Sequence, residues 1–150
     1  MTLRIKVAVA AVFALLAGVG SAQDDNRFSA RLSWAPVSLS ELRLVGGGGS
    51  ATASLARNRL RIEGSFTDLP AVVTAVRLHD GVAPGASGPA IADLDASGNE
   101  SGQFSGEVEL NRRQREALVA GELYVQVYGE AGVPPDNSIL RGWLFAESDQ

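Results

Sequence analysis

Hydrophobic and polar residues alternate one by one along most of the chain, and this period of two predicts β-strands. The alternation is cleanest over residues 59–66. There Leu60, Ile62 and Phe66 lie on one face, and arginine, glutamate and serine lie on the other. The same period predicts strands over residues 27–34, 51–55, 59–66, 72–79, 89–94, 103–110, 123–128 and 139–145. Short strands separated by turn residues indicate an all-β sandwich or barrel of about eight antiparallel strands.

One segment breaks this period and predicts a short helix near residues 111–120. Asn111 can cap its start, Gln114 can return the bond three residues on, and Gly121 is a stop signal. The first turns also carry three arginines, Arg112, Arg113 and Arg115. They indicate either an anion-binding patch or a solvated helix face, and we favour the solvated face because charge runs on helices usually contact water.

Four other segments show no clear period. Residues 46–50 read as a flexible glycine loop, residues 95–102 as a polar loop and residues 129–137 as a long loop with two prolines. Residues 37–45 are ambiguous.

The strand over residues 72–79 is the most informative stretch, because it holds the only histidine of the chain. Its alternation sends Val76 and Leu78 toward the core and places Arg77 and His79 together on the other face. Asp80 begins a turn, and a loop rich in glycine and proline follows over residues 81–89. Arg77, His79 and Asp80 are therefore either a candidate site or a solvated strand end, and the solvated end is the more common case.

The N-terminus predicts export. A short basic start leads into an apolar run from Val7 to Val19 and then into small residues, which is typical of a signal peptide cleaved between Ala22 and Gln23. The run is short for a membrane span, so an uncleaved anchor is the less favoured alternative. We therefore expect a signal peptide over residues 1–22, one domain over residues 23–150, and a periplasmic or secreted protein with no membrane contact after cleavage.

Charge and motifs exclude several classes of function. The formal net charge is −4, and removing residues 1–22 takes away Arg4 and Lys6 and makes the chain more acidic, which argues against nucleic-acid binding. Lys6 is the only lysine, so a phosphate-binding loop of the nucleotide-hydrolase type is absent. The lone histidine suits no serine-hydrolase triad, and no spacing singles out a pair of glycosidase carboxylates. We therefore expect no enzyme activity.

Side chains from three predicted strands offer one possible binding surface. Arg77 and His79 share a strand face, and so do the residues of two later strands: Tyr124, Gln126, Tyr128, Arg141 and Trp143. If these strands are neighbours, they form an aromatic, hydrogen-bonding wall under the loops over residues 81–89 and 129–137. The wall is either a binding surface or a second small core, and we favour the core because an arginine at a loop base is usually structural.

The order of motifs resembles a known family. The segments that carry the resemblance are Phe28-Ser29-Ala30-Arg31-Leu32, Leu78-His79-Asp80-Gly81, Ala83-Pro84-Gly85, Gly88-Pro89, Gly106-Glu107-Val108-Glu109-Leu110, Gly121-Glu122-Leu123-Tyr124-Val125-Gln126-Val127 and Leu140-Arg141-Gly142-Trp143-Leu144. Together they resemble the CHRD domain, named for repeats in chordin and common in exported bacterial proteins. The resemblance covers residues 27–145 and implies a Greek-key β fold similar to the copper-zinc superoxide dismutase barrel.

The chain departs from that family at positions that matter for metal binding. The resemblance implies histidines where this chain has Arg77 and Tyr128, and a glutamate where it has Ile139, so only His79 remains. A lone histidine with Asp80 and Tyr128 is a poor ligand set for copper or zinc.

These observations lead to one interpretation and one alternative. The first is an exported, non-catalytic binding or structural module that needs no cofactor and whose partner is a protein or polysaccharide of the cell envelope. Its expected site residues are Arg77, His79, Asp80, Tyr128, Arg141 and Trp143. The alternative is a degenerate copper-binding protein that uses His79, with two copies each giving one imidazole.

Overall fold

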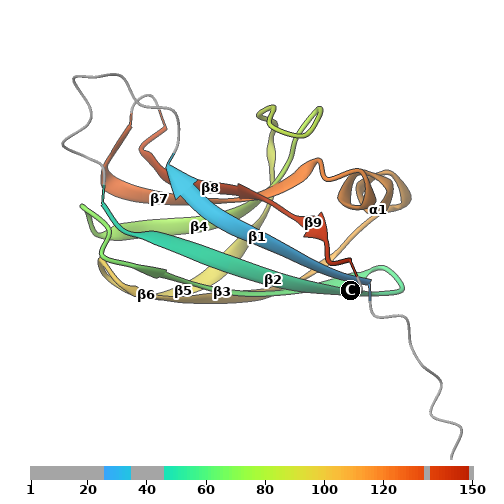
Figure 1. Ribbon diagram of the computed structural model, residues 1–150, viewed down its shortest axis with the longest axis horizontal. Helices are drawn as coiled ribbons and strands as arrows, with labels where there is room; N and C mark the ends of the chain where they lie inside the picture. The colour runs from blue at the N-terminus through green and yellow to red at the C-terminus, as the bar shows by residue number, and fades with distance from the viewer. Residues whose placement is uncertain (1–25, 35–45, 134–135, 149–150) are drawn as a thin grey trace, which may run out of the picture.

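The computed structural model describes residues 26–34, 46–133 and 136–148, which form nine strands and one helix in these ranges (Figure 1). In chain order they are β1 (Asn26–Trp34), β2 (Gly48–Ala56), β3 (Arg59–Thr67), β4 (Val73–Asp80), β5 (Ala90–Gly98), β6 (Gly102–Glu109), α1 (Arg112–Val119), β7 (Leu123–Val133), β8 (Ser138–Trp143) and β9 (Phe145–Ala146). The predicted signal peptide, its cleavage site at Ala22 and Gln23, and the ambiguous residues 37–45 lie outside the described ranges.

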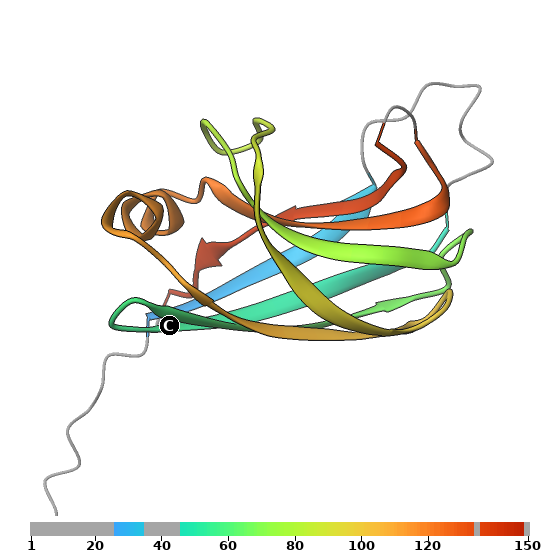
Figure 2. The same cartoon turned by 180° about the vertical axis from the view of Figure 1, so that it is seen from behind.

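The strands close into an antiparallel barrel. Their order is β2-β3-β6-β5-β4-β7-β8-β1, and β1 pairs again with β2, so the last strand meets the first (Figures 1 and 2). The short β9 pairs with β1 beside this ring. Strands β4, β5 and β6 follow one another, and β7 returns to lie beside β4, which is a Greek key. The predicted all-β Greek-key fold of about eight antiparallel strands with one short helix is confirmed.

The predicted alternation builds the core. Leu60, Ile62 and Phe66 of β3 point inward and are buried, as are Val76 and Leu78 of β4. Small residues make room for larger ones on neighbouring strands, as Gly64 of β3 does for Phe104 of β6. A Cβ on Gly64 would lie 2.2 Å from the Phe104 ring, so the glycine allows that ring to pack against the strand backbone.

The helix α1 lies at one end of the barrel (Figure 1) and has the predicted capping box between Asn111 and Gln114. It ends before Gly121, whose φ of +73° favours glycine. The arginines of its first turn point largely to solvent, with exposed side-chain fractions of 87% for Arg112 and 66% for Arg113. Arg113 nevertheless forms an ion pair with buried Asp80, which connects α1 to the end of β4.

Three of the predicted loops contain strand. β2 begins at Gly48, β5 continues through Asp95–Gly98, and β7 continues past Gly129 to Val133. The sequence did not predict the end of β5, because all its residues from Asp95 to Gly98 are exposed. A strand with no buried face shows no hydrophobic alternation. At Asp95 this strand changes partner from β4 to β6.

Within the described residues, the single helix is too short and too polar to cross a membrane.

Candidate functional site

Strand register brings the predicted wall together on the outside of the barrel. β4 pairs with β7 and β7 with β8, so Arg77, Gln126 and Arg141 form one cross-strand row. His79 lies opposite Tyr124, which lies opposite Trp143, in the next row. We call this surface the aromatic–arginine face; its residues are Arg77, His79, Tyr124, Gln126, Tyr128, Arg141 and Trp143.

Both ring nitrogens of His79 make hydrogen bonds within the aromatic–arginine face. Its Nδ1 is 2.8 Å from the carbonyl oxygen of Gly88, and its Nε2 is 2.6 Å from the hydroxyl oxygen of Tyr128. A carbonyl can only accept, so Nδ1 carries the proton and donates to Gly88. In the neutral ring Nε2 is then an acceptor, and the Tyr128 hydroxyl donates to it.

Burial and charge keep the two groups in these protonation states. Burial is the largest cause that lowers the pKa of His79 below its ordinary value of 6.5, and the positive charges of Arg141 and Arg77 lower it further. Burial, followed by the negative charge of Asp136, raises the pKa of Tyr128 above its ordinary value of 10.0. At neutral pH the imidazole is therefore uncharged and the phenol keeps the proton that it donates.

Tyr124 holds the loop over residues 81–89 against the barrel. Its hydroxyl accepts a hydrogen bond from the Gly88 N–H and donates one to the Gly88 carbonyl, both at 3.0 Å. Its ring stacks on His79, with centroids 4.7 Å apart, and packs against Trp143 at 5.1 Å. Tyr124 is only 1% exposed. The loop therefore rests on a buried aromatic layer, as the predicted core under the loops requires.

The two arginines lie over the aromatic rings. The Arg77 guanidinium is 5.2 Å from the centre of the Tyr128 ring and forms a 2.7 Å ion pair with Asp93. The Arg141 guanidinium lies 5.3 Å from the Tyr124 ring centre and 5.9 Å from that of Trp143. All three guanidinium-to-ring distances are typical of cation–π contacts.

Arg141 is held by two further hydrogen bonds. Its Nε donates to Gln126 at 3.0 Å, and one terminal nitrogen donates to the Ser87 hydroxyl at 2.9 Å. The Gln126 amide cannot flip, because its nitrogen donates to Asp136 at 3.0 Å. The chain Asp136–Gln126–Arg141 therefore fixes the position of the guanidinium.

Asp80, a predicted site residue, does not belong to the aromatic–arginine face. It lies one position after His79 on the strand and therefore points to the opposite side, at the end of the barrel. There it pairs with Arg113, while its Oδ1 is buried with no partner among the described residues. The structure thus joins Arg77, His79, Tyr128, Arg141 and Trp143 and separates Asp80 from them.

Several residues of the network were not expected from the sequence. Ser87, Gly88, Asp93 and Asp136 all contact the aromatic–arginine face. Three of them come from loops, which carry no period that would indicate direction. Gly88 is part of the Gly88-Pro89 motif, but only the structure shows why a glycine is needed, because a Cβ would lie 1.8 Å from the backbone oxygen of Asp80.

The residues around His79 do not fit a copper or zinc ion. Both nitrogens already make hydrogen bonds, and a metal would need a free nitrogen lone pair together with further imidazole, thiolate or carboxylate ligands. Across residues 26–34, 46–133 and 136–148, no three histidine, cysteine or acidic side chains come together as a ligand set. The neighbouring Arg77 and Arg141 are cations, which repel a metal ion.

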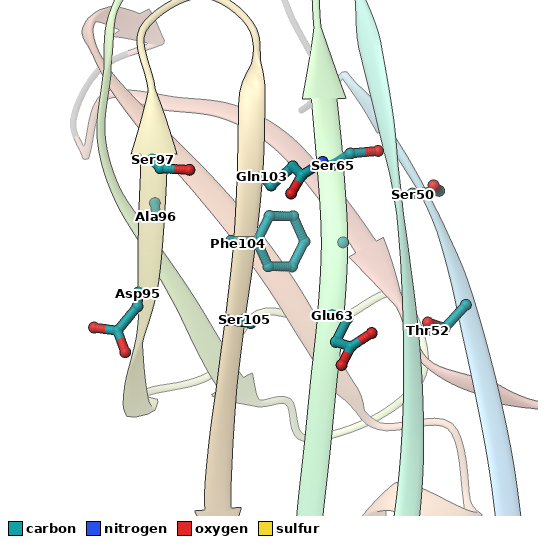
Figure 3. A pocket seen from close by; sticks show the side chains of 11 residues that line it. Ser50, Thr52, Glu63, Ser65, Asp95, Ala96, Ser97, Gln103, Phe104 and Ser105 are labelled. Atoms are coloured by element: carbon teal, nitrogen blue, oxygen red, sulfur yellow. The ribbon is translucent and has the colours of Figure 1, made fainter.

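A hollow lies elsewhere, on the outside of β2, β3, β6 and β5, and measures about 690 Å³ (Figure 3). We call it the hydroxyl face; its outward polar residues are Ser50, Thr52, Glu63, Ser65, Asp95, Ser97, Gln103 and Ser105. Register places them in two complete cross-strand rows of four. The Asp95 and Glu63 carboxylates point away from each other (Figure 3), so they do not form the facing pair of a glycosidase.

A match to a protein-family model shows which family the chain belongs to. The model of the CHRD domain matches residues 28–133, which is more than half of the chain. The chain belongs to the CHRD domain family. The family consists of binding-type rather than enzymatic β domains, so this chain is a CHRD β domain of a binding or structural type. The matched range ends before β8, so Arg141 and Trp143 lie outside it. No curated protein matches the chain.

Proposed function

We propose that this CHRD domain is an exported, non-catalytic binding module of the cell envelope or the medium. Its recognition surface is the aromatic–arginine face, and its partner is a polysaccharide or protein of the envelope. Export is supported by residues 1–22, whose basic start, apolar run and small residues before Gln23 are typical of a signal peptide.

The two arginines are the reason for choosing the aromatic–arginine face as the recognition surface. Arg77 and Arg141 are partly exposed cations. Arg141 is held in place by two aromatic rings and two hydrogen bonds, and Arg77 lies over the Tyr128 ring. A side chain that is already ordered loses little entropy when it binds, so preorganised groups give more affinity than free ones. The buried Tyr124, Gln126 and His79 then support the exposed groups and need not touch the ligand themselves.

The same network argues against catalysis. A general base needs a free lone pair within reach of a substrate proton. The Nε2 lone pair of His79 accepts from Tyr128, and the ring is only 7% exposed. Binding is therefore the function that this arrangement supports best.

Trp143 supplies a direct test, because the chain has only two tryptophans. In a Trp34→Phe variant all indole fluorescence and the one indole N–H signal come from Trp143. Titration with soluble envelope polysaccharides and purified envelope proteins should shift these signals together with the amide signals of β7 and β8. Ligand-induced shifts confined to β2, β3 and β6 would contradict the proposal, because they would place binding on the hydroxyl face.

Export has its own test. N-terminal sequencing of the protein recovered from the periplasm or medium should begin at Gln23. A chain that stays in the cytoplasm with residues 1–22 attached would overturn the exported role.

A further inference from the structure

Arg141 has more hydrogen-bond donors than it uses within the protein. A guanidinium has five N–H groups, and Arg141 uses one toward Gln126 and one toward Ser87. The Ser87 hydroxyl accepts that bond and keeps its own proton for a further acceptor. Among the described residues no acceptor takes the remaining Arg141 donors, so this part of the face suits a ligand that only accepts.

The positive charge of Arg141 also favours an anionic ligand. Its neighbours on the face are the uncharged rings of Tyr124, Trp143 and His79, and no carboxylate of the described residues lies within ion-pair distance of it. The Asp136 carboxylate instead accepts hydrogen bonds from Gln126 and from the Ser138 backbone. An anion beside Arg141 would therefore gain a charge-assisted, bidentate pair without displacing another.

A second cation lies in the same row. Arg77 and Arg141 flank Gln126, two strand spacings or on the order of 10 Å apart. Arg77 has a partner in Asp93, but that carboxylate is 82% exposed, and such a surface pair is weak and easily exchanged. A ligand with carboxylates at intervals can thus contact both cations.

We propose that the aromatic–arginine face binds the carboxylates of an acidic polysaccharide, such as a polyuronate. Arg141 and Ser87 hold one carboxylate, and Arg77 contacts a second one along the same chain. This inference rests on the proposed function and names its ligand class. A sugar acid is favoured over an acidic peptide because it joins a carboxylate to a rigid ring with an apolar side. The partly exposed Trp143 next to Arg141 offers a surface for that ring.

The experiment measures affinity for polygalacturonate oligomers by calorimetry at low and high salt. Arg141→Met should weaken binding about tenfold or more, and Arg141→Lys should weaken it less because the charge remains without the planar fork. Ser87→Ala should cost only a few-fold and leaves the buried layer intact. The matched control is Arg61→Met, which removes one cation from the opposite side of the barrel and should leave affinity unchanged.

Two other ligands, a neutral dextran and polyglutamate, separate the possible outcomes. A neutral dextran should not bind. Polyglutamate that binds as tightly as polygalacturonate, with the same dependence on Arg141, would overturn the choice of a polysaccharide. Polygalacturonate binding that ignores both Arg141→Met and Ser87→Ala would overturn this inference but leave the proposed face standing if Trp143 still responds. If no carboxylate polymer binds but an uncharged ligand shifts the Trp143 signals, the inference fails and the proposed function survives.

Discussion

The two outer faces of this barrel arise from the same alternation of residues but differ in how their side chains are held. On the aromatic–arginine face, His79, Tyr124 and Gln126 are buried and each makes hydrogen bonds to named partners. On the hydroxyl face, within the described residues, no polar side chain of the two rows hydrogen-bonds to another protein group. The hydroxyl face, although it is hollowed, is therefore the less organised surface.

A hollow alone does not make a binding site. Short exposed hydroxyls are satisfied by water, so the hydroxyl face needs no partner. Buried polar groups lose about 1 to 3 kcal/mol each if left unpaired. On the aromatic–arginine face His79, Tyr124 and Gln126 are all paired, and only the buried Nε1 of Trp143 has no partner among the described residues. Such a network holds its exposed arginines in one geometry, which is what recognition requires.

The sharpest test of this difference removes one member from each face. Tyr124→Ala deletes a buried ring, its two hydrogen bonds to Gly88 and its stacking on His79, so the free energy of unfolding should fall by about 3 kcal/mol or more. Thr52→Ala on the hydroxyl face should change it by less than about 0.5 kcal/mol. Urea denaturation of both variants measures the two effects. Equal losses would mean that the faces do not differ in organisation.

The loop over residues 81–89 offers a second test with a matched pair of glycines. Gly88→Ala places a methyl group 1.8 Å from the Asp80 backbone oxygen and pushes the loop off Tyr124 and His79, at a cost of about 2 to 3 kcal/mol. Gly85→Ala meets no atom within 4 Å and costs only the strain of its φ of +84°, about 1 kcal/mol. Hydrogen exchange of the loop amides should speed up much more in Gly88→Ala. Similar exchange rates in both variants would show that the hydrogen bonds of Gly88 to Tyr124 and His79 do not hold the loop.

Much of the fold follows from the sequence because alternation is a local signal. The cores of the strands, the facing of Val76 and Leu78, and the capped helix at Asn111 all depend on residues close together in the chain. Which strands become neighbours is not local, so the wall of Arg77, Tyr124 and Arg141 was predicted only on the condition that β4, β7 and β8 pair.

The candidate site was predictable in part for the same reason. Strand residues such as Tyr128 and Trp143 were found because alternation fixes their face, whereas Ser87 and Asp136 lie in segments with no period. Asp80 was grouped with His79 because the two are adjacent in sequence, yet the period of two already places it with Leu78 on the inner side. Adjacency in a strand separates side chains rather than joining them.

The pH dependence of stability tests whether His79 is buried as an uncharged ring. Its folded-state pKa is lowered, so the unfolded state binds the proton more tightly. The stabilisation is complete above the ordinary pKa of 6.5 and is lost as the pH falls from there through the folded-state pKa, by at most about 1.4 kcal/mol per pH unit. Urea unfolding between pH 7.5 and 5.5 should show this slope, and His79→Gln should flatten it because the chain has no other histidine. An unchanged slope in His79→Gln would place the titrating group outside the aromatic–arginine face.

The smallest expected effect is the response to metal. Copper or zinc should leave the thermal midpoint of the chain from Gln23 unchanged, because Tyr128 and Gly88 occupy both nitrogens of His79. The informative control is the double variant Arg77→His with Tyr128→His. It adds two imidazoles to the same face, one two positions before His79 on β4 and one on the adjacent β7 where Tyr128 contacts His79, and should create a midpoint that rises with metal. A metal-dependent rise in the unmodified chain that His79→Ala abolishes would restore the degenerate copper-binding alternative. It would also mean that the hydrogen bond from Tyr128 opens readily, and that this face is less organised than its contacts indicate.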